Sequence, residues 1–174
     1  MSRQSSDEAR HEVALYSDSY EIKGTLVTRP PRRLLDILND RFRSILPLTE
    51  ASIRPLVAEP GTRPLAVPSL IVNKEGIIMA WLIEETEVLS AEFITVHKVA
   101  RPVTAYVGPF VIRGQMHAIQ EATLLQALDA VTEDFIALAE PSAVCVTSPW
   151  LSLKEGVIAA LRKSSLAALQ ERAS

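Results

Sequence analysis

The stretch YEIKGTLVTRPPRRLLDILNDRFRSILPLTEASI, residues 20–53, carries the pattern that decides the fold. Apolar and polar residues alternate from Tyr20 to Val27, which predicts a strand. Pro30-Pro31 ends that strand, because neither residue has an N–H to donate to a neighbouring strand. An apolar stripe over residues 32–39 then predicts a short helix, and residues 45–48 predict a brief closing strand.

The same order of features returns ninety positions later. Residues 13–53 and 103–143 align without a gap, and ten positions are identical. The ten pairs are Val13/Val103, Tyr16/Tyr106, Ile22/Ile112, Gly24/Gly114, Leu34/Leu124, Leu35/Leu125, Leu38/Leu128, Leu48/Leu138, Glu50/Glu140 and Ser52/Ser142. Because the matches fall on a strand glycine and on the apolar face of a helix, we interpret them as an internal repeat.

The rest of the chain predicts three further elements. Asn73-Lys74-Glu75-Gly76 separates two strongly apolar runs and predicts a hairpin between them. Residues 88–99 predict a further strand. Ser152-Leu153-Lys154-Glu155 has the spacing of a capping box, so an amphipathic helix is predicted from there to about Arg172.

We therefore predict an α+β protein, mainly antiparallel β, in which two pseudo-symmetric β-hairpin–helix–strand repeats form a shared barrel or sandwich. The predicted divisions are a disordered N-terminus over residues 1–12, a first repeat with its connecting hairpin over 13–100, a second repeat over 101–150 and a C-terminal helix over 151–174.

Composition narrows the class of protein. Of 174 residues, 48% are apolar, which predicts a packed core, and the net charge of −3 is too small to indicate a nucleic-acid or membrane partner by itself. Cys145 is the single cysteine and lies in an apolar run, so we expect it buried. The polar N-terminus resembles no signal peptide, and no apolar stretch is long enough to span a bilayer, so we expect a cytoplasmic protein without a membrane partner.

Reactive motifs are not evident in the sequence. His11, His97 and His117 have no metal-ligand spacing, and no two of the six glycines lie close enough for a phosphate-binding loop. Glu50 and Glu140 each end a predicted strand, and we expect turn carboxylates there, with a mutually perturbed pair as the alternative. We accordingly predict no catalytic, cofactor-binding or metal-binding residue, and no enzyme activity.

The clearest charge feature is an asymmetry between the two copies. Residues 29–54 hold six arginines against three acidic residues, a balance of +3, and residues 119–144 hold five acidic residues and no basic one, a balance of −5. The basic set is Arg29, Arg32, Arg33, Arg41, Arg43 and Arg54. The acidic set is Glu121, Asp129, Glu133, Asp134 and Glu140.

Two main interpretations follow from the charge asymmetry. The basic set of one molecule can meet the acidic set of another, which predicts a non-catalytic, self-associating scaffolding module, either a homo-oligomer or one that binds a protein partner. Alternatively, the Arg29–Arg54 face binds RNA or DNA through phosphates, although an aromatic content of 5% gives little support for base stacking. An enzyme of an unrecognised class is a third alternative.

The chain also resembles a bacterial family of uncharacterised small β-rich domains. The resemblance is carried by Tyr20-x-Ile22-x-Gly24-x-Leu26, Arg33-Leu34-Leu35-Asp36-Ile37-Leu38-Asn39, Leu46-Pro47-Leu48-Thr49-Glu50-Ala51 and Leu70-Ile71-Val72-Asn73-Lys74. It covers residues 13–78 and, more weakly, 103–146, where the helix lacks the Arg, Asp and Asn of the pattern. It implies a β-rich fold present in two copies, with no catalytic residue.

Overall fold

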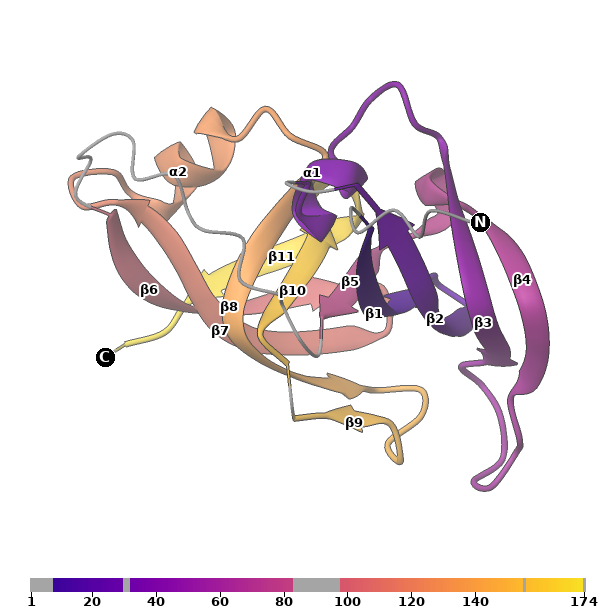
Figure 1. The fold of residues 1–174 in the computed structure, drawn as a ribbon. Helices are drawn as coiled ribbons and strands as arrows, with labels where there is room; N and C mark the ends of the chain where they lie inside the picture. The colour runs from indigo at the N-terminus through magenta and orange to yellow at the C-terminus, as the bar shows by residue number, and fades with distance from the viewer. Residues whose placement is uncertain (1–7, 30–31, 83–97, 155, 174) are drawn as a thin grey trace.

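A computed structural model describes residues 8–29, 32–82, 98–154 and 156–173 (Figure 1). Strands make up most of the described chain, and every pair of neighbouring strands is antiparallel. The helices are short: α1 spans Leu34–Leu38 and α2 spans Leu124–Ala130. The predicted α+β class with mainly antiparallel β is therefore confirmed.

The first half of the chain, residues 9–82, contributes five strands and α1. The strands are β1 (Ala9–Tyr16), β2 (Tyr20–Thr28), β3 (Ile45–Pro55), β4 (Leu65–Asn73) and β5 (Met79–Leu82), with a 3-10 turn, η1 (Lys74–Gly76), before β5. In the sheet they lie in the order β5-β1-β2-β3-β4.

The second half, residues 98–171, contributes the remaining strands and α2. They are β6 (Lys98–Val107), β7 (Phe110–Ile119), β8 (Phe135–Cys145), β9 (Ser152–Leu153), β10 (Ile158–Arg162) and β11 (Leu166–Glu171), with a 3-10 turn, η2 (Lys163–Ser165), before β11. Their order is β11-β6-β7-β8-β10, and β9 pairs with β8 outside this path.

The strand pairings of the two halves correspond residue by residue. Ile45 pairs with Asn73 in the first half, and Phe135, ninety positions after Ile45, pairs with Arg162, eighty-nine positions after Asn73. The pairing of β5 with β1 returns with the same offsets in the pairing of β11 with β6. The β2–β3 and β7–β8 ladders also shift register at equivalent positions, after Lys23 and Arg113.

That shared register shift explains two glycines and two strained glutamates. Glu50 and Glu140 are the non-glycine residues of the described chain with positive φ, at 49° and 48°. A side chain at Gly24 or Gly114 would bring its Cβ to 3.2 or 3.0 Å from a carbonyl oxygen of the opposite strand. The close approach of the two backbones therefore favours glycine at both positions.

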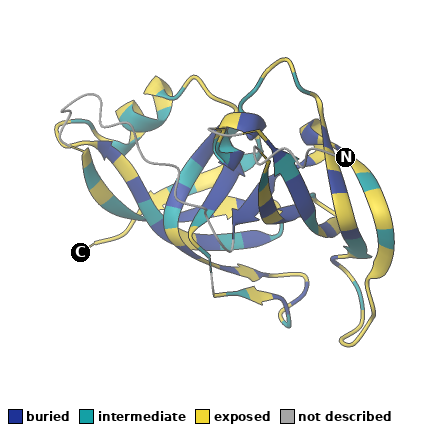
Figure 2. Ribbon diagram, viewed as in Figure 1, coloured by how far each residue is buried: buried dark blue, intermediate teal, exposed yellow. Residues whose placement is uncertain are grey.

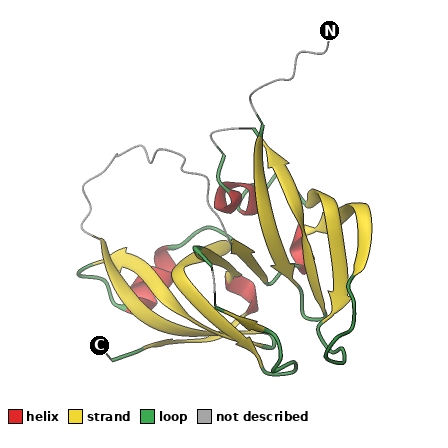
Figure 3. Cartoon of the chain, turned by 60° about the horizontal axis from the view of Figure 1, so that its bottom comes forward, coloured by secondary structure: helices red, strands yellow, loops and turns green. Residues whose placement is uncertain are grey.

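The two halves join through one pair of strands, β10 and β5. The ladder runs from Ile158 opposite Leu82 to Leu161 opposite Met79 and makes the sheet continuous across the halves. Figure 3 shows the strands of each half as a curved group, with the two groups side by side. The described strands form one open path that ends at β11 and β4, so the expected shared barrel or sandwich is not confirmed.

Each half also contributes residues to the other half's core. One cluster of buried side chains belongs mainly to the second half but includes Tyr16 and Trp81 of the first. The other belongs mainly to the first half but includes Phe135 and Ala160 of the second. Figure 2 shows buried residues concentrated in the central strands, whereas β4 at one end of the sheet is largely exposed. The junction is therefore an apolar interface as well as a strand pair.

The predicted C-terminal helix is wrong. The described residues between 152 and 171 contain β9, β10, η2 and β11. Leu, Ala, Gln and Arg favour helix locally, but Ile158–Arg162 lies between β8 and β5 and hydrogen-bonds to both. Burial between two strands outweighs intrinsic helix propensity, which amounts to less than about 1 kcal/mol per residue.

The predicted hairpin across residues 73–76 is also wrong. β4 pairs with β3, and β5 pairs with β1 and β10, so the two runs that flank η1 are not neighbours. β5 is buried throughout, whereas β4 lies at the edge of the sheet and is largely exposed. The N-terminal prediction needs a correction too, since β1 begins at Ala9 and His11 is buried beside Thr28. The strand predicted over residues 88–99 lies outside the described residues up to residue 97, and Lys98-Val99 begins β6.

Gly156 offers a test of the packing at the junction. A Cβ at this position would lie 2.4 Å from Nε1 of the buried Trp81 indole, whereas a Cβ at Gly76 would meet nothing within 4 Å. We expect Gly156→Ala to lower the free energy of unfolding by about 1–3 kcal/mol, because the rigid indole has to move. The matched Gly76→Ala is expected to change it by less than about 0.5 kcal/mol. Denaturant unfolding measures both, and equal effects would contradict this packing.

Candidate interaction site

The six arginines of the predicted basic face do not form one surface. Arg54 lies at the far end of β3 from the others and makes an ion pair through Nε with Glu21. Its guanidinium also stacks on the Trp150 ring, 4.5 Å from the centroid. Arg54 is therefore committed to contacts within the protein.

Glu21 explains why Arg54 is held there. Its side chain is only 3% exposed, and it accepts a hydrogen bond of 3.2 Å from the Tyr16 hydroxyl. Lys23 Nζ lies 3.3 Å from the same carboxylate. Burial, reinforced by the Glu21 charge, raises the pKa of Tyr16. A buried carboxylate requires partners of this kind, so the cluster is structural.

The segment after α1 contacts the second half of the same chain. The Asn39 side chain donates to the Phe135 carbonyl oxygen at 3.2 Å and accepts from the Phe135 N–H at 2.8 Å. Arg41 Nη2 donates to the Thr132 carbonyl oxygen at 2.8 Å. Parts of the basic and acidic segments thus meet within one molecule, at the junction.

The acidic residues are dispersed in the structure. Glu133 and Asp134 line a hollow of about 420 Å3 together with Lys163, whose backbone N–H donates to the Asp134 carbonyl oxygen at 2.8 Å. Three more are exposed at separate places: Glu121 before α2, Asp129 on α2 and Glu140 at the register shift of β8. Glu50 is likewise exposed and lies on β3, so β2, β1, β5 and β10 separate it from β8 in the sheet.

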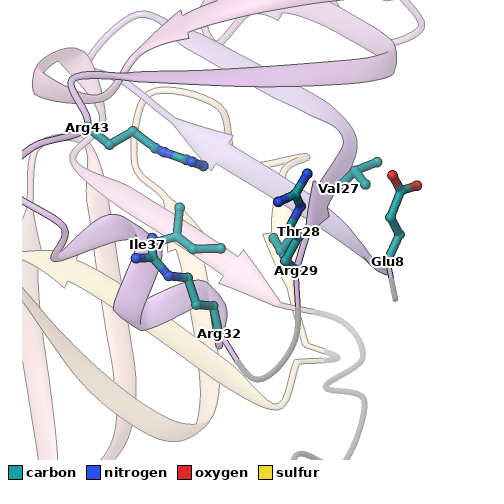
Figure 4. Close-up of a pocket in the computed structure, with 7 residues that line it drawn as sticks. All are labelled: Glu8, Val27, Thr28, Arg29, Arg32, Ile37 and Arg43. Atoms are coloured by element: carbon teal, nitrogen blue, oxygen red, sulfur yellow. The ribbon is translucent and has the colours of Figure 1, made fainter. Parts of the chain in front are cut away.

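Three of the arginines line one hollow. Arg29, Arg32 and Arg43 surround a space of about 510 Å3 next to α1 (Figure 4). Arg33, by contrast, caps α1, where its N–H donates to Asp36.

Sequence reasoning missed Phe42. Its side chain is fully exposed, at 101%, in the turn between α1 and β3. Its position between Arg41 and Arg43 was the available signal, because an aromatic residue flanked by arginines is typical of surfaces that bind nucleotides.

The open β4 edge exposes large apolar residues. Ile71 is 71% exposed, and Ile45, at the start of the neighbouring β3, is 49% exposed. Their counterparts in the second half are Ala160 and Phe135, which the β10–β5 junction buries to 0% and 1%. Equivalent positions are thus covered on one side of the molecule and uncovered on the other.

The helices differ in the same way. Leu34 and Leu38 of α1 are fully buried, in the cluster that contains Phe135 and Ala160. Leu124 and Leu128 of α2 are only partly buried. The second half lacks the cover that the junction gives to the first.

The described residues contain no group of three His, Cys, Asp or Glu side chains able to hold a metal ion. Cys145 is buried, as predicted. No helix of the described chain has the length and apolar character needed to cross a membrane.

No family model, curated protein or solved structure matches the chain.

Asn39 provides a test of the polar contact across the junction. Asn39→Ala removes both bonds to Phe135, and we expect a loss of about 1–3 kcal/mol in unfolding free energy because two partly buried backbone groups lose their partner. The control Asp36→Ala, on the same helix, removes one exposed bond within the first half and is expected to cost about 0.5–1 kcal/mol. Urea unfolding compares them, and a smaller loss for Asn39→Ala than for Asp36→Ala would contradict the assignment.

Proposed function

We propose that this protein is a non-catalytic, self-associating scaffolding module, built from a duplicated unit, in which β4 of one copy pairs with β11 of the next. One observation carries the proposal: the chain already joins its own two halves by pairing β10 with β5. β10 pairs with β8 as β4 pairs with β3, so β10 corresponds to β4. β5 pairs with β1 as β11 pairs with β6, so β5 corresponds to β11. The two free edges are therefore counterparts of two strands that bind each other.

The correspondence specifies a register between copies. In the internal ladder Ile158, Ala159, Ala160 and Leu161 lie opposite Leu82, Trp81, Ala80 and Met79. Transferred to the free edges, the ladder places Ser69, Leu70, Ile71 and Val72 of one copy opposite Glu171, Gln170, Leu169 and Ala168 of the next. An unpaired strand edge offers a row of N–H and C=O groups to another chain, so this pairing needs no rearrangement of the fold.

Apolar burial supports the same contact. In the internal junction Phe135 and Ala160 pack on the core that contains α1. In the contact between copies, Ile45 and Ile71 take their places and meet the partly buried leucines of α2. Covering these side chains removes apolar surface from water, which stabilises association by about 25 cal/mol for each Å2 buried.

The contact between copies also has two weaker points than the internal junction. Val157 N–H donates to the Leu82 carbonyl oxygen at 2.9 Å, but the equivalent Pro68 has no N–H. Asn39 is replaced by Asp129, which accepts from a backbone N–H but cannot donate to a carbonyl oxygen. We therefore expect an association that depends on protein concentration, while the two halves of one chain stay joined.

The contact uses two different edges, so each added copy leaves one edge of each kind free. Such a head-to-tail interface generates a ring when the rotation per copy closes and a filament when it does not. In either case copies are displayed in a regular array, which is the property expected of a scaffold.

A charge placed on the β4 edge tests the proposal. We expect Ile71→Lys to weaken self-association by about tenfold or more, because the contact would bury an unpaired ammonium group. The matched control is Leu65→Lys, on the same strand and 65% exposed, but outside the proposed register. Light scattering after size exclusion, over a concentration series, measures the assembly state. A wild-type protein that stays monomeric throughout, or equal effects of both lysines, would contradict the proposal.

A further inference from the structure

The hollow beside α1 has the lining of an anion site. Its wall contains the guanidinium groups of Arg29, Arg32 and Arg43 and the single carboxylate of Glu8, so its charge is three minus one, +2. In Figure 4 the Arg43 side chain points across the hollow toward Arg29, while Arg32 extends from below α1. Cations from separate segments of the chain thus face a common space.

Two of these cations have no acidic partner within the described chain. Arg32 pairs with Asp40 through Nη1 and Oδ2 at 3.0 Å, whereas neither Arg29 nor Arg43 forms an ion pair with a described carboxylate. The Phe42 N–H, followed by Arg32 and Arg43, lowers the pKa of Asp40. Asp40 therefore remains ionised and holds Arg32 in position, while Arg29 and Arg43 are available to an anion.

Size and polarity identify the class of ligand. The volume of about 510 Å3 lies within the usual range of small-molecule sites and far exceeds what one phosphate ion requires. Val27, which is partly exposed, gives the wall an apolar part, suited to the uncharged portion of a ligand. Guanidinium groups match the acceptor geometry of phosphate oxygens, which they bind in pairs.

We propose that the Arg29–Arg32–Arg43 hollow binds the phosphate ester of a nucleotide, with the arginines on the phosphate and Val27 against the uncharged part. No residue of the proposed register between copies lines the hollow. The nucleotide is either free or part of a single strand. Phe42, next to Arg43 in the chain, distinguishes the two ligands. A base can stack on Phe42 only when it belongs to a strand that extends beyond the hollow.

Calorimetric titration of the full chain at low salt with uridine 5′-monophosphate tests the site. We expect saturable binding that Arg29→Ala and Arg43→Ala each weaken by about tenfold or more, since each removes a charged hydrogen-bond donor. Glu8→Gln is expected to strengthen binding by about two- to fivefold, because it removes the negative charge from the wall. Both arginines lie outside the cores, so the fold should persist, and Arg63→Ala, in the exposed loop at the other end of β3, is the control.

A short single-stranded oligouridylate forms the second arm. Tighter binding of the strand that Phe42→Ala abolishes assigns the site to nucleotides within a strand, and equal affinity for both ligands assigns it to the free nucleotide. The proposal is overturned if uridine binds as tightly as its monophosphate, if neither phosphate ligand binds, or if the arginine variants bind like the Arg63→Ala control.

Discussion

The pairing of β10 with β5 is the interaction on which the rest of this structure depends. It joins the five strands of the first half and the six strands of the second into one continuous sheet and closes both hydrophobic cores. Phe135 and Ala160 reach the first core only because β10 lies beside β5, and Trp81 reaches the second core for the same reason. A half without its neighbour would expose these surfaces, as the uncovered leucines of α2 illustrate.

The polar contacts follow from the same junction. Asn39 satisfies both backbone groups of Phe135 at the point where β8 begins, and Arg41 adds a bond to Thr132. The basic and acidic segments of the sequence thus contact each other within one chain. Two features of the surface take no part in this junction. One is the group of arginines around the hollow, and the other is the pair of sheet edges, β4 and β11, which correspond to the paired strands β10 and β5.

Elements that depend on local patterns could be predicted from the sequence, whereas elements that depend on contacts between distant segments could not. Alternation around Gly24 and the apolar stripe over residues 32–39 identify a strand and a helix correctly, since those patterns are local. The C-terminal helix was wrong because the Ile158–Leu161 run owes its conformation to β8 and β5, neither of which is near it in sequence. The hairpin at residues 73–76 failed for a related reason, because a glycine after a polar turn does not specify which strands will pair. Three arginines of the predicted basic face line a common hollow. Arg54 instead forms an ion pair with the buried Glu21, a partner that the sequence alone did not reveal.

The central claim is that the two free edges recognise each other in the register of the internal junction. Arg162 N–H donates to the Ile78 carbonyl oxygen at 2.8 Å, so the alternate pair Ala159/Trp81 is not hydrogen-bonded, and its counterpart between copies is Leu70/Gln170. Side chains of such pairs lie close enough for a disulfide.

The most direct measurement mixes two variants, Leu70→Cys and Gln170→Cys, under oxidising conditions and resolves the products on a non-reducing gel. The account predicts a disulfide-linked dimer from the mixture and none from either variant alone or from Leu65→Cys mixed with Gln170→Cys. Equal cross-linking of the Leu65→Cys mixture, or no cross-link in the Leu70→Cys mixture, would contradict it.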